Sequence, residues 1–94
     1  TVDLHTPKYC ISVTEEGVFR VPCFDVKVKR VTGAGDAWNA GDIFGYLAGM
    51  ESRERLITAS AVAGFYISEG RAPSREEVAS FVKHTRFLAF ETSI

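Results

Sequence analysis

The sequence predicts an α/β fold in which a β-rich first third precedes a helical remainder. Up to about residue 31, short runs of β-branched and apolar residues are separated by turn residues, which is typical of β-strands. From about residue 33 onward, apolar residues recur at helical spacing, and glycine, proline and serine mark the helix ends. The predicted order is therefore three strands followed by three helices.

The first two predicted strands form a hairpin. The segment YCISVT at 9–14 is apolar and β-branched, and Pro7 and Lys8 provide a turn before it. The segment EEG at 15–17 interrupts this pattern, and VFRVP at 18–22 resumes it. We therefore expect two antiparallel strands joined by a loop of about three residues.

A third strand is predicted over 25–31, where DVKVKRV alternates between apolar and basic residues. Such alternation is typical of a strand at the edge of a sheet or with one face in water. The alternation breaks only at its last step, where a glycine-rich turn begins.

The first helix is predicted from about Gly35 to Gly49, and glycine recurs along it every four residues, at Gly41, Gly45 and Gly49. Each glycine costs a helix roughly 1 kcal/mol relative to alanine. Repeated glycine on one face therefore indicates that another backbone comes close there. We expect tight packing between this helix and the sheet.

The second and third helices have clear ends. The second is predicted over 53–68, is apolar nearly all round and stops at Gly70, a residue typical of helix C-termini. Ser74 and Glu77 form a capping box that opens the third helix, REEVASFVKH. This order fits a separate α+β domain or the last part of a larger α/β sheet. The apolar second helix favours the larger body, because 94 residues offer little interior to bury it.

Composition excludes several classes of function. A formal net charge of −1 gives no electrostatic basis for binding nucleic acid or an anionic membrane. No apolar run reaches the ~18 residues of a transmembrane helix. Cys10 and Cys23 have no metal-ligand spacing, so we expect free, buried thiols in a reducing, cytoplasmic compartment and no metal site. The first residue is Thr1, from which we expect a fragment of a longer protein.

Residues 32–36, TGAGD, lie where the last predicted strand meets the first helix. No lysine follows Gly35, which excludes a Walker A loop, and Trp38 replaces the third glycine of a Rossmann motif. The first amides of a helix have no internal partners, and small residues let an anion reach them. Asp36 can then accept a proton from a nucleophile that attacks the bound anion. The alternative is that these residues only cap a helix.

The stretch VTGAGDAWNAG at 31–41 resembles the C-terminal signature of the PfkB, or ribokinase-like, family of carbohydrate and nucleoside kinases. CISVTEEGVF at 10–19 resembles the strand and nucleotide loop of that family, and SEGRAPSREEV at 68–78 resembles its closing turn. The resemblance covers nearly the whole chain. It implies that residues 1–94 are the C-terminal, ATP-side portion of a ribokinase-like kinase domain that lacks its N-terminal part.

The resemblance also implies roles for individual residues. Asp36 would be the catalytic base that activates the acceptor hydroxyl, and its amide would join those of Gly33, Ala34 and Gly35 in an anion hole for the γ-phosphate. The nucleotide-binding residues would be Ser12, Val13, Thr14, Glu15, Glu16, Gly17 and Ala59. The donor would be ATP with Mg²⁺, and the magnesium ligands of the family lie upstream of the part that this chain resembles.

The implied reaction is ATP-dependent phosphorylation of a hydroxyl on a small sugar or nucleoside. We expect the fragment alone to be inactive without the missing N-terminal part, and a homodimer is compatible with the sequence. Arg30 and Val31 replace an aspartate and a threonine of the signature, and Thr14 replaces a glycine of the nucleotide loop. In relatives that aspartate helps hold an activating monovalent cation, which the guanidinium of Arg30 argues against here. The alternative function is a non-catalytic α/β domain whose GAGD turn is structural or only binds an anion.

Overall fold

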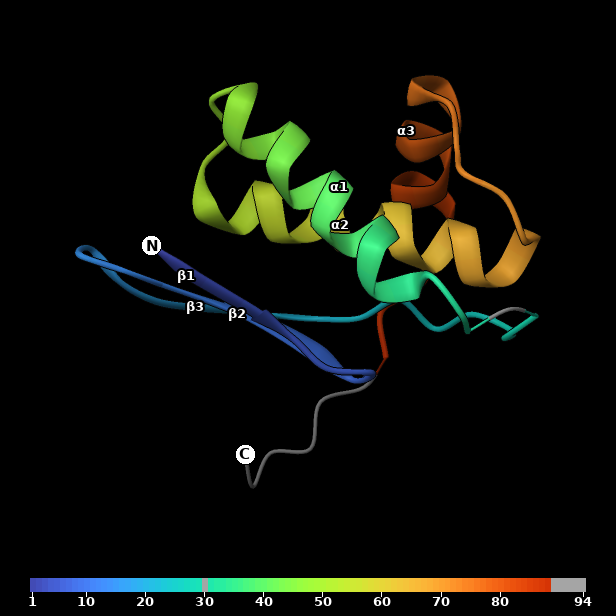
Figure 1. Ribbon diagram of the computed structural model, residues 1–94, viewed down its shortest axis with the longest axis horizontal. Coiled ribbons are helices and arrows are strands. Elements are labelled where there is room, and N and C mark those ends of the chain that lie inside the picture. The colour runs from blue at the N-terminus through green and yellow to red at the C-terminus, as the bar shows by residue number, and fades with distance from the viewer. Residues whose placement is uncertain (30, 89–94) are drawn as a thin grey trace.

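Three antiparallel strands form one sheet, and three helices gather on one side of it (Figure 1). The computed structural model describes residues 1–29 and 31–88. Along the chain the elements are β1 (Val2–His5), β2 (Tyr9–Thr14), β3 (Gly17–Pro22), α1 (Ala34–Leu47), α2 (Ser52–Glu69) and α3 (Arg75–His84). The predicted α/β class and the order of strands followed by helices are confirmed, although one of the three strands is not one of those predicted.

The β2–β3 hairpin is confirmed, with a shorter loop than expected. Thr14 lies opposite Gly17, so Glu15 and Glu16 alone make the turn. The strand β1 is an addition to the predicted set, because four residues are too few to establish an alternating pattern. It pairs antiparallel with β2 on the side away from β3, which makes β2 the central strand.

The prediction of a strand over 25–31 is wrong. Apart from Arg30, which lies outside the described residues, no part of this segment is a strand. The Lys29 N–H donates to the carbonyl of Ile67 in α2 at 2.7 Å, so the segment runs against that helix instead of a neighbouring strand. Alternation gives a segment two chemically different faces, but only a partner strand can turn it into part of a sheet.

The central element of the fold is α2, which contacts α1, α3, β2 and β3. This arrangement confirms the expectation of a helix buried on most sides. The helix ends at Gly70, whose left-handed φ of 79° confirms the predicted C-terminal role. The predicted capping box of α3 is also confirmed, because the Glu77 N–H donates to Ser74 Oγ at 3.1 Å and the Ser74 N–H donates to Glu77 Oε1 at 2.9 Å.

The glycine face of α1 packs against a helix and not against the sheet, which corrects the expected partner. A Cβ added to Gly41 would lie 2.8 Å from the Cα of Ala59, and one added to Gly45 would lie 2.9 Å from Cγ of Arg55. Both contacts are with α2. Gly49 has a different role, since it has a φ of +78° just after α1 and open space around it.

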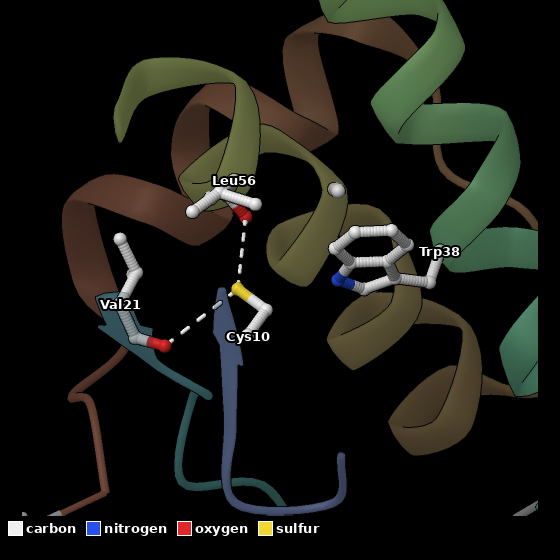
Figure 2. Packing of buried hydrophobic residues seen from close by; sticks show 5 residues of the cluster. Cys10, Val21, Trp38 and Leu56 are labelled. Carbon is white, nitrogen blue, oxygen red and sulfur yellow. Dashed lines mark hydrogen bonds between the residues drawn. The ribbon is translucent and has the colours of Figure 1, made fainter. Parts of the chain in front are cut away.

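The core lies where α2 meets the sheet and α1 (Figure 2). Sγ of Cys10 lies 3.6 Å from the carbonyl oxygen of Val21 and 3.8 Å from that of Leu56. Trp38, from α1, closes the cluster with 3% of its surface exposed. Both cysteines are free as expected, although Cys23 is only half-buried. Within residues 1–29 and 31–88, no helix combines the length and hydrophobicity that crossing a membrane requires.

Candidate active site

The turn that opens α1 is a type II β-turn over Val31–Ala34. The Ala34 N–H donates to the Val31 carbonyl at 3.0 Å, which closes the turn. Gly33 has φ 91° and ψ −1°, the values that a type II turn requires at its third position. Glycine is the residue that adopts this left-handed conformation without steric cost. No side chain caps α1, so this turn alone sets how the helix begins.

Three of the four predicted anion-hole amides are open. The backbone N–H groups of Gly33, Gly35 and Asp36 have no acceptor among the residues that the structure describes, and the first bond into the helix runs from the Ala37 N–H to the Gly33 carbonyl. The amide of Ala34 is already used by the turn. The open amides and the helix dipole together leave partial positive charge at this end of α1. The predicted role of Ala34 would require its bond to Val31 to be exchanged for one to the ligand.

Asp36 is solvent-exposed in the first turn of α1. Its carboxylate is therefore accessible to a molecule that binds from outside at the start of α1. Within the described part of the chain, no three histidine, cysteine or acidic residues are grouped so that they could hold a metal ion.

Tyr66 of α2 contacts the Val31–Ala34 turn through its side chain. Its hydroxyl donates to the carbonyl oxygen of Thr32 at 2.9 Å. A Cβ on Gly33 would lie 2.7 Å from the same hydroxyl, so the turn and the tyrosine pack closely. The sequence offered one signal for this contact, which is a tyrosine hydroxyl within the apolar run AVAGFYI at 61–67 of α2.

A cavity of about 370 Å³ opens beside the turn. Its walls come from the β1–β2 connection, the segment before α1, and the helices α1 and α2. Most of the wall is apolar, and it includes Val31 and Ala34 of the turn together with Gly35, Trp38 and Ala63. His5 also lines the cavity, and its ring stacks on Trp38 with the centroids 4.6 Å apart.

The predicted nucleotide loop, residues 12–17, lies in the β2–β3 hairpin. The tip of that hairpin and the start of α1 lie at opposite ends of the sheet (Figure 1). Ser12 is fully buried, its hydroxyl donates to Asp3 Oδ1 at 2.6 Å, and it accepts from Arg55 Nη2 at 2.8 Å. The structure therefore does not bring this loop together with the turn at Gly33.

Ala59, the remaining predicted nucleotide residue, is fully buried and faces Gly41 of α1. It does not line the cavity. Its neighbours Ser60 and Ala63 do, because they lie on the adjacent face of α2. The cavity therefore joins Ala34 and Gly35 of the predicted anion hole to the face of α2 that carries Ser60 and Ala63, and Ala59 lies outside it.

A second polar cluster surrounds Arg55, whose side chain is only 5% exposed. Its Nε lies 3.1 Å from Asp3 Oδ2 and 3.0 Å from Asp42 Oδ1. Burial and the neighbouring Asp3 raise the pKa of Asp42 to about 6, although Arg55 opposes the shift. Burial acts to raise the pKa of Asp3 as well, but hydrogen bonds with Asp42, Arg55 and Ser12 lower it below its usual value. This cluster ties β1 and β2 to both long helices.

Comparison with known proteins supports the predicted resemblance. A family model described as prokaryotic ketohexokinase matches residues 1–85, and these kinases are sugar kinases of the PfkB type. The match spans every strand and helix described above, including the turn at Gly33 and the walls of the cavity. No curated protein matches the chain.

Proposed function

The chain belongs to the prokaryotic ketohexokinase family, and from that premise we propose that it carries the phosphoryl-transfer side of a sugar kinase. In the reaction, the bond between the γ-phosphorus of ATP and its bridging oxygen breaks. A hydroxyl oxygen of the sugar forms the new bond to phosphorus, and the hydroxyl proton passes to a base. The acceptor class is a small sugar, as the family description indicates.

One observation carries this proposal: three open amides and an exposed carboxylate occur together at the start of α1. The amides of Gly35 and Asp36, with that of Gly33, would hold the oxygens of the transferring phosphoryl group. Donors of this kind are each worth ~10²–10³-fold in turnover, because they meet charge that develops in the transition state. Asp36 would accept the proton of the attacking hydroxyl, which contributes ~10²–10⁴-fold.

The test is Asp36→Asn in the intact protein, with Asp25→Asn as the matched control on the exposed segment before α1. We expect kcat for sugar phosphorylation to fall at least ~100-fold in Asp36→Asn, because the amide cannot take the proton. Binding of ATP, measured by calorimetry, should stay near the wild-type value. Wild-type turnover in Asp36→Asn would leave the alternative, in which the GAGD turn is structural or only binds an anion.

The apolar cavity beside the turn is where we place the nucleoside part of ATP. Its volume of about 370 Å³ is at the small end of the range for ligand sites. It adjoins Ala34 and Gly35, so a nucleobase there would leave the phosphates directed at the open amides. Mg²⁺ would accompany ATP, and we propose that residues other than those described here hold it. A nucleotide role for residues 12–17 stays a prediction.

A monovalent cation fits poorly at this turn. The Thr32 carbonyl already accepts a hydrogen bond from Tyr66, so a cation would have to displace that hydroxyl. Arg30 lies outside the described residues, and its positive charge gives a second argument against a cation. We expect turnover of the intact enzyme to change less than about twofold when K⁺ replaces a bulky organic cation at constant ionic strength. Strong activation by K⁺ would contradict this expectation.

A further inference from the structure

The turn that opens α1 has two backbone forms open to it. Type I and type II β-turns share the bond that closes the turn and differ in the orientation of the central peptide, which here joins Thr32 to Gly33. Glycine at the third position permits both forms, because it has little preference between positive and negative φ. The structure has the type II form, with a φ of 91° at Gly33.

The hydroxyl of Tyr66 bonds to the one peptide that distinguishes the two forms. It donates to the Thr32 carbonyl at 2.9 Å, and a rotated peptide would point that carbonyl away from it. A trans peptide is planar, so its N–H points opposite to its C=O. The same hydrogen bond therefore directs the Gly33 N–H away from Tyr66. This amide is one of the donors assigned above to the phosphoryl group.

Tyr66 is well placed to act as a fixed support. It projects from α2, the element that contacts both other helices and two strands. Its hydroxyl lies within 2.7 Å of the position that a Cβ on Gly33 would take, so the contact is close as well as polar. The tyrosine belongs to a different element from the turn, and local sequence alone could not supply this restraint.

We infer that Tyr66 is a positioning residue that holds the Val31–Ala34 turn in its type II form and so aims the Gly33 amide at the transferring phosphoryl group. The inference rests on the proposed function. The tyrosine touches no substrate in this role. Its hydroxyl acts through the peptide, so its loss should lower the fraction of enzyme with a correctly oriented donor.

The experiment compares the wild type with Tyr66→Phe, Asp36→Asn and the control Tyr46→Phe in the intact protein, using ATP and a ketose. Tyr46 is exposed on α1 and its hydroxyl has no hydrogen-bond partner among the described residues. For Tyr66→Phe we expect kcat to fall about three- to tenfold, which corresponds to the net free energy of one hydrogen bond. The KM for the sugar and the melting temperature should stay near the wild-type values. Tyr46→Phe should match the wild type.

A second variant tests the turn directly. Gly33→Ala alone places a Cβ against the Tyr66 hydroxyl and forces alanine to adopt a positive φ. In the Tyr66→Phe background the peptide is free to rotate, which relieves both the close contact and the positive φ. The loss of kcat caused by Gly33→Ala should therefore be smaller in the Tyr66→Phe background, and strictly additive losses would overturn the inference. So would wild-type kcat in Tyr66→Phe when Asp36→Asn is inactive. Wild-type kcat in Asp36→Asn would instead overturn the proposed function, and the inference with it.

Discussion

Arg55 illustrates how a single buried charge organises the packing around it. Its guanidinium is held between Asp3 of β1 and Asp42 of α1, and Ser12 of β2 supplies a further oxygen. A buried cation without such partners would be strongly destabilising. Burial, together with the second carboxylate beside this one guanidinium, raises the pKa of Asp42 to about 6.

This cluster predicts a dependence of stability on pH. The pKa of Asp42 in the folded protein, about 6, lies above the ordinary aspartate value of 3.8. The contribution of Asp42 to stability is therefore fully present below about pH 4 and is lost as pH rises through about 6. In Asp42→Asn this loss should vanish, while the amide oxygen can still accept from Arg55.

We expect Asp42→Asn to gain stability relative to the wild type between pH 4 and pH 8. The gain should be on the order of 1 kcal/mol after allowance for solvent screening. Urea unfolding at several pH values measures it, with Asp25→Asn on an exposed segment as the control. A stability difference that does not change with pH would contradict the assignment of the raised pKa to Asp42.

At the scale of elements, the contact between α1 and α2 depends on the absence of side chains. Gly41 and Gly45 allow the backbone of α1 to approach Ala59 and Arg55 closely. The cost of glycine within a helix, roughly 1 kcal/mol each, is offset by the packing that close approach permits. The glycine pattern predicted a nearby backbone, but a pattern in one helix does not identify the element that it faces.

Two glycine substitutions in the same helix should have opposite effects. In Gly41→Ala the new Cβ would meet the Cα of Ala59 at 2.8 Å, and backbone cannot move aside cheaply. In Gly35→Ala the nearest atom is in the His5 side chain at 3.8 Å, an ordinary contact. We expect Gly41→Ala to lower the free energy of unfolding by about 1–2 kcal/mol, since overpacking outweighs helix propensity.

Gly35→Ala should raise the free energy of unfolding by up to about 1 kcal/mol through helix propensity alone. Thermal and urea unfolding of both variants in one buffer provide the comparison. Equal effects of the two substitutions would mean that the close approach at Gly41 does not govern the stability of the α1–α2 contact.

At the scale of the whole molecule, the cavity is assembled from parts that are distant in sequence. His5, Val31 and Ala63 line it from the end of β1, the segment before α1, and α2. Only when these segments are packed does the first turn of α1 gain an apolar neighbour. The proposed site is therefore a property of the fold and not of the glycine motif alone.

Filling this cavity should weaken nucleotide binding. We expect Ala63→Leu to raise KM for ATP about tenfold in the intact protein, by steric exclusion of the nucleoside, with a smaller change in KM for the sugar. Ala79→Leu, on the exposed side of α3, is the control. If Ala63→Leu leaves KM for ATP unchanged and Thr14→Ala raises it, the nucleotide binds at the β2–β3 hairpin instead.

The sequence by itself determined the features that depend on neighbouring residues. The helix ends at Gly70 and Ser74, the hairpin around Glu15 and the glycine turn before α1 all follow from local dihedral preferences and capping. The family also follows from the sequence, because its signature is a continuous motif. The residues proposed for catalysis, Gly33 to Asp36, belong to that motif.

The tertiary structure decided everything that depends on long-range partners. It turned the alternating segment after Phe24 away from the sheet, placed α2 against the glycines of α1, buried Arg55 between two carboxylates and brought Tyr66 to the turn. Each of these contacts joins residues far apart in the chain, and the energy of such a contact exists only once both segments are packed. Local propensity therefore fixes where the elements begin and end, and packing between elements fixes which amides and side chains surround Asp36.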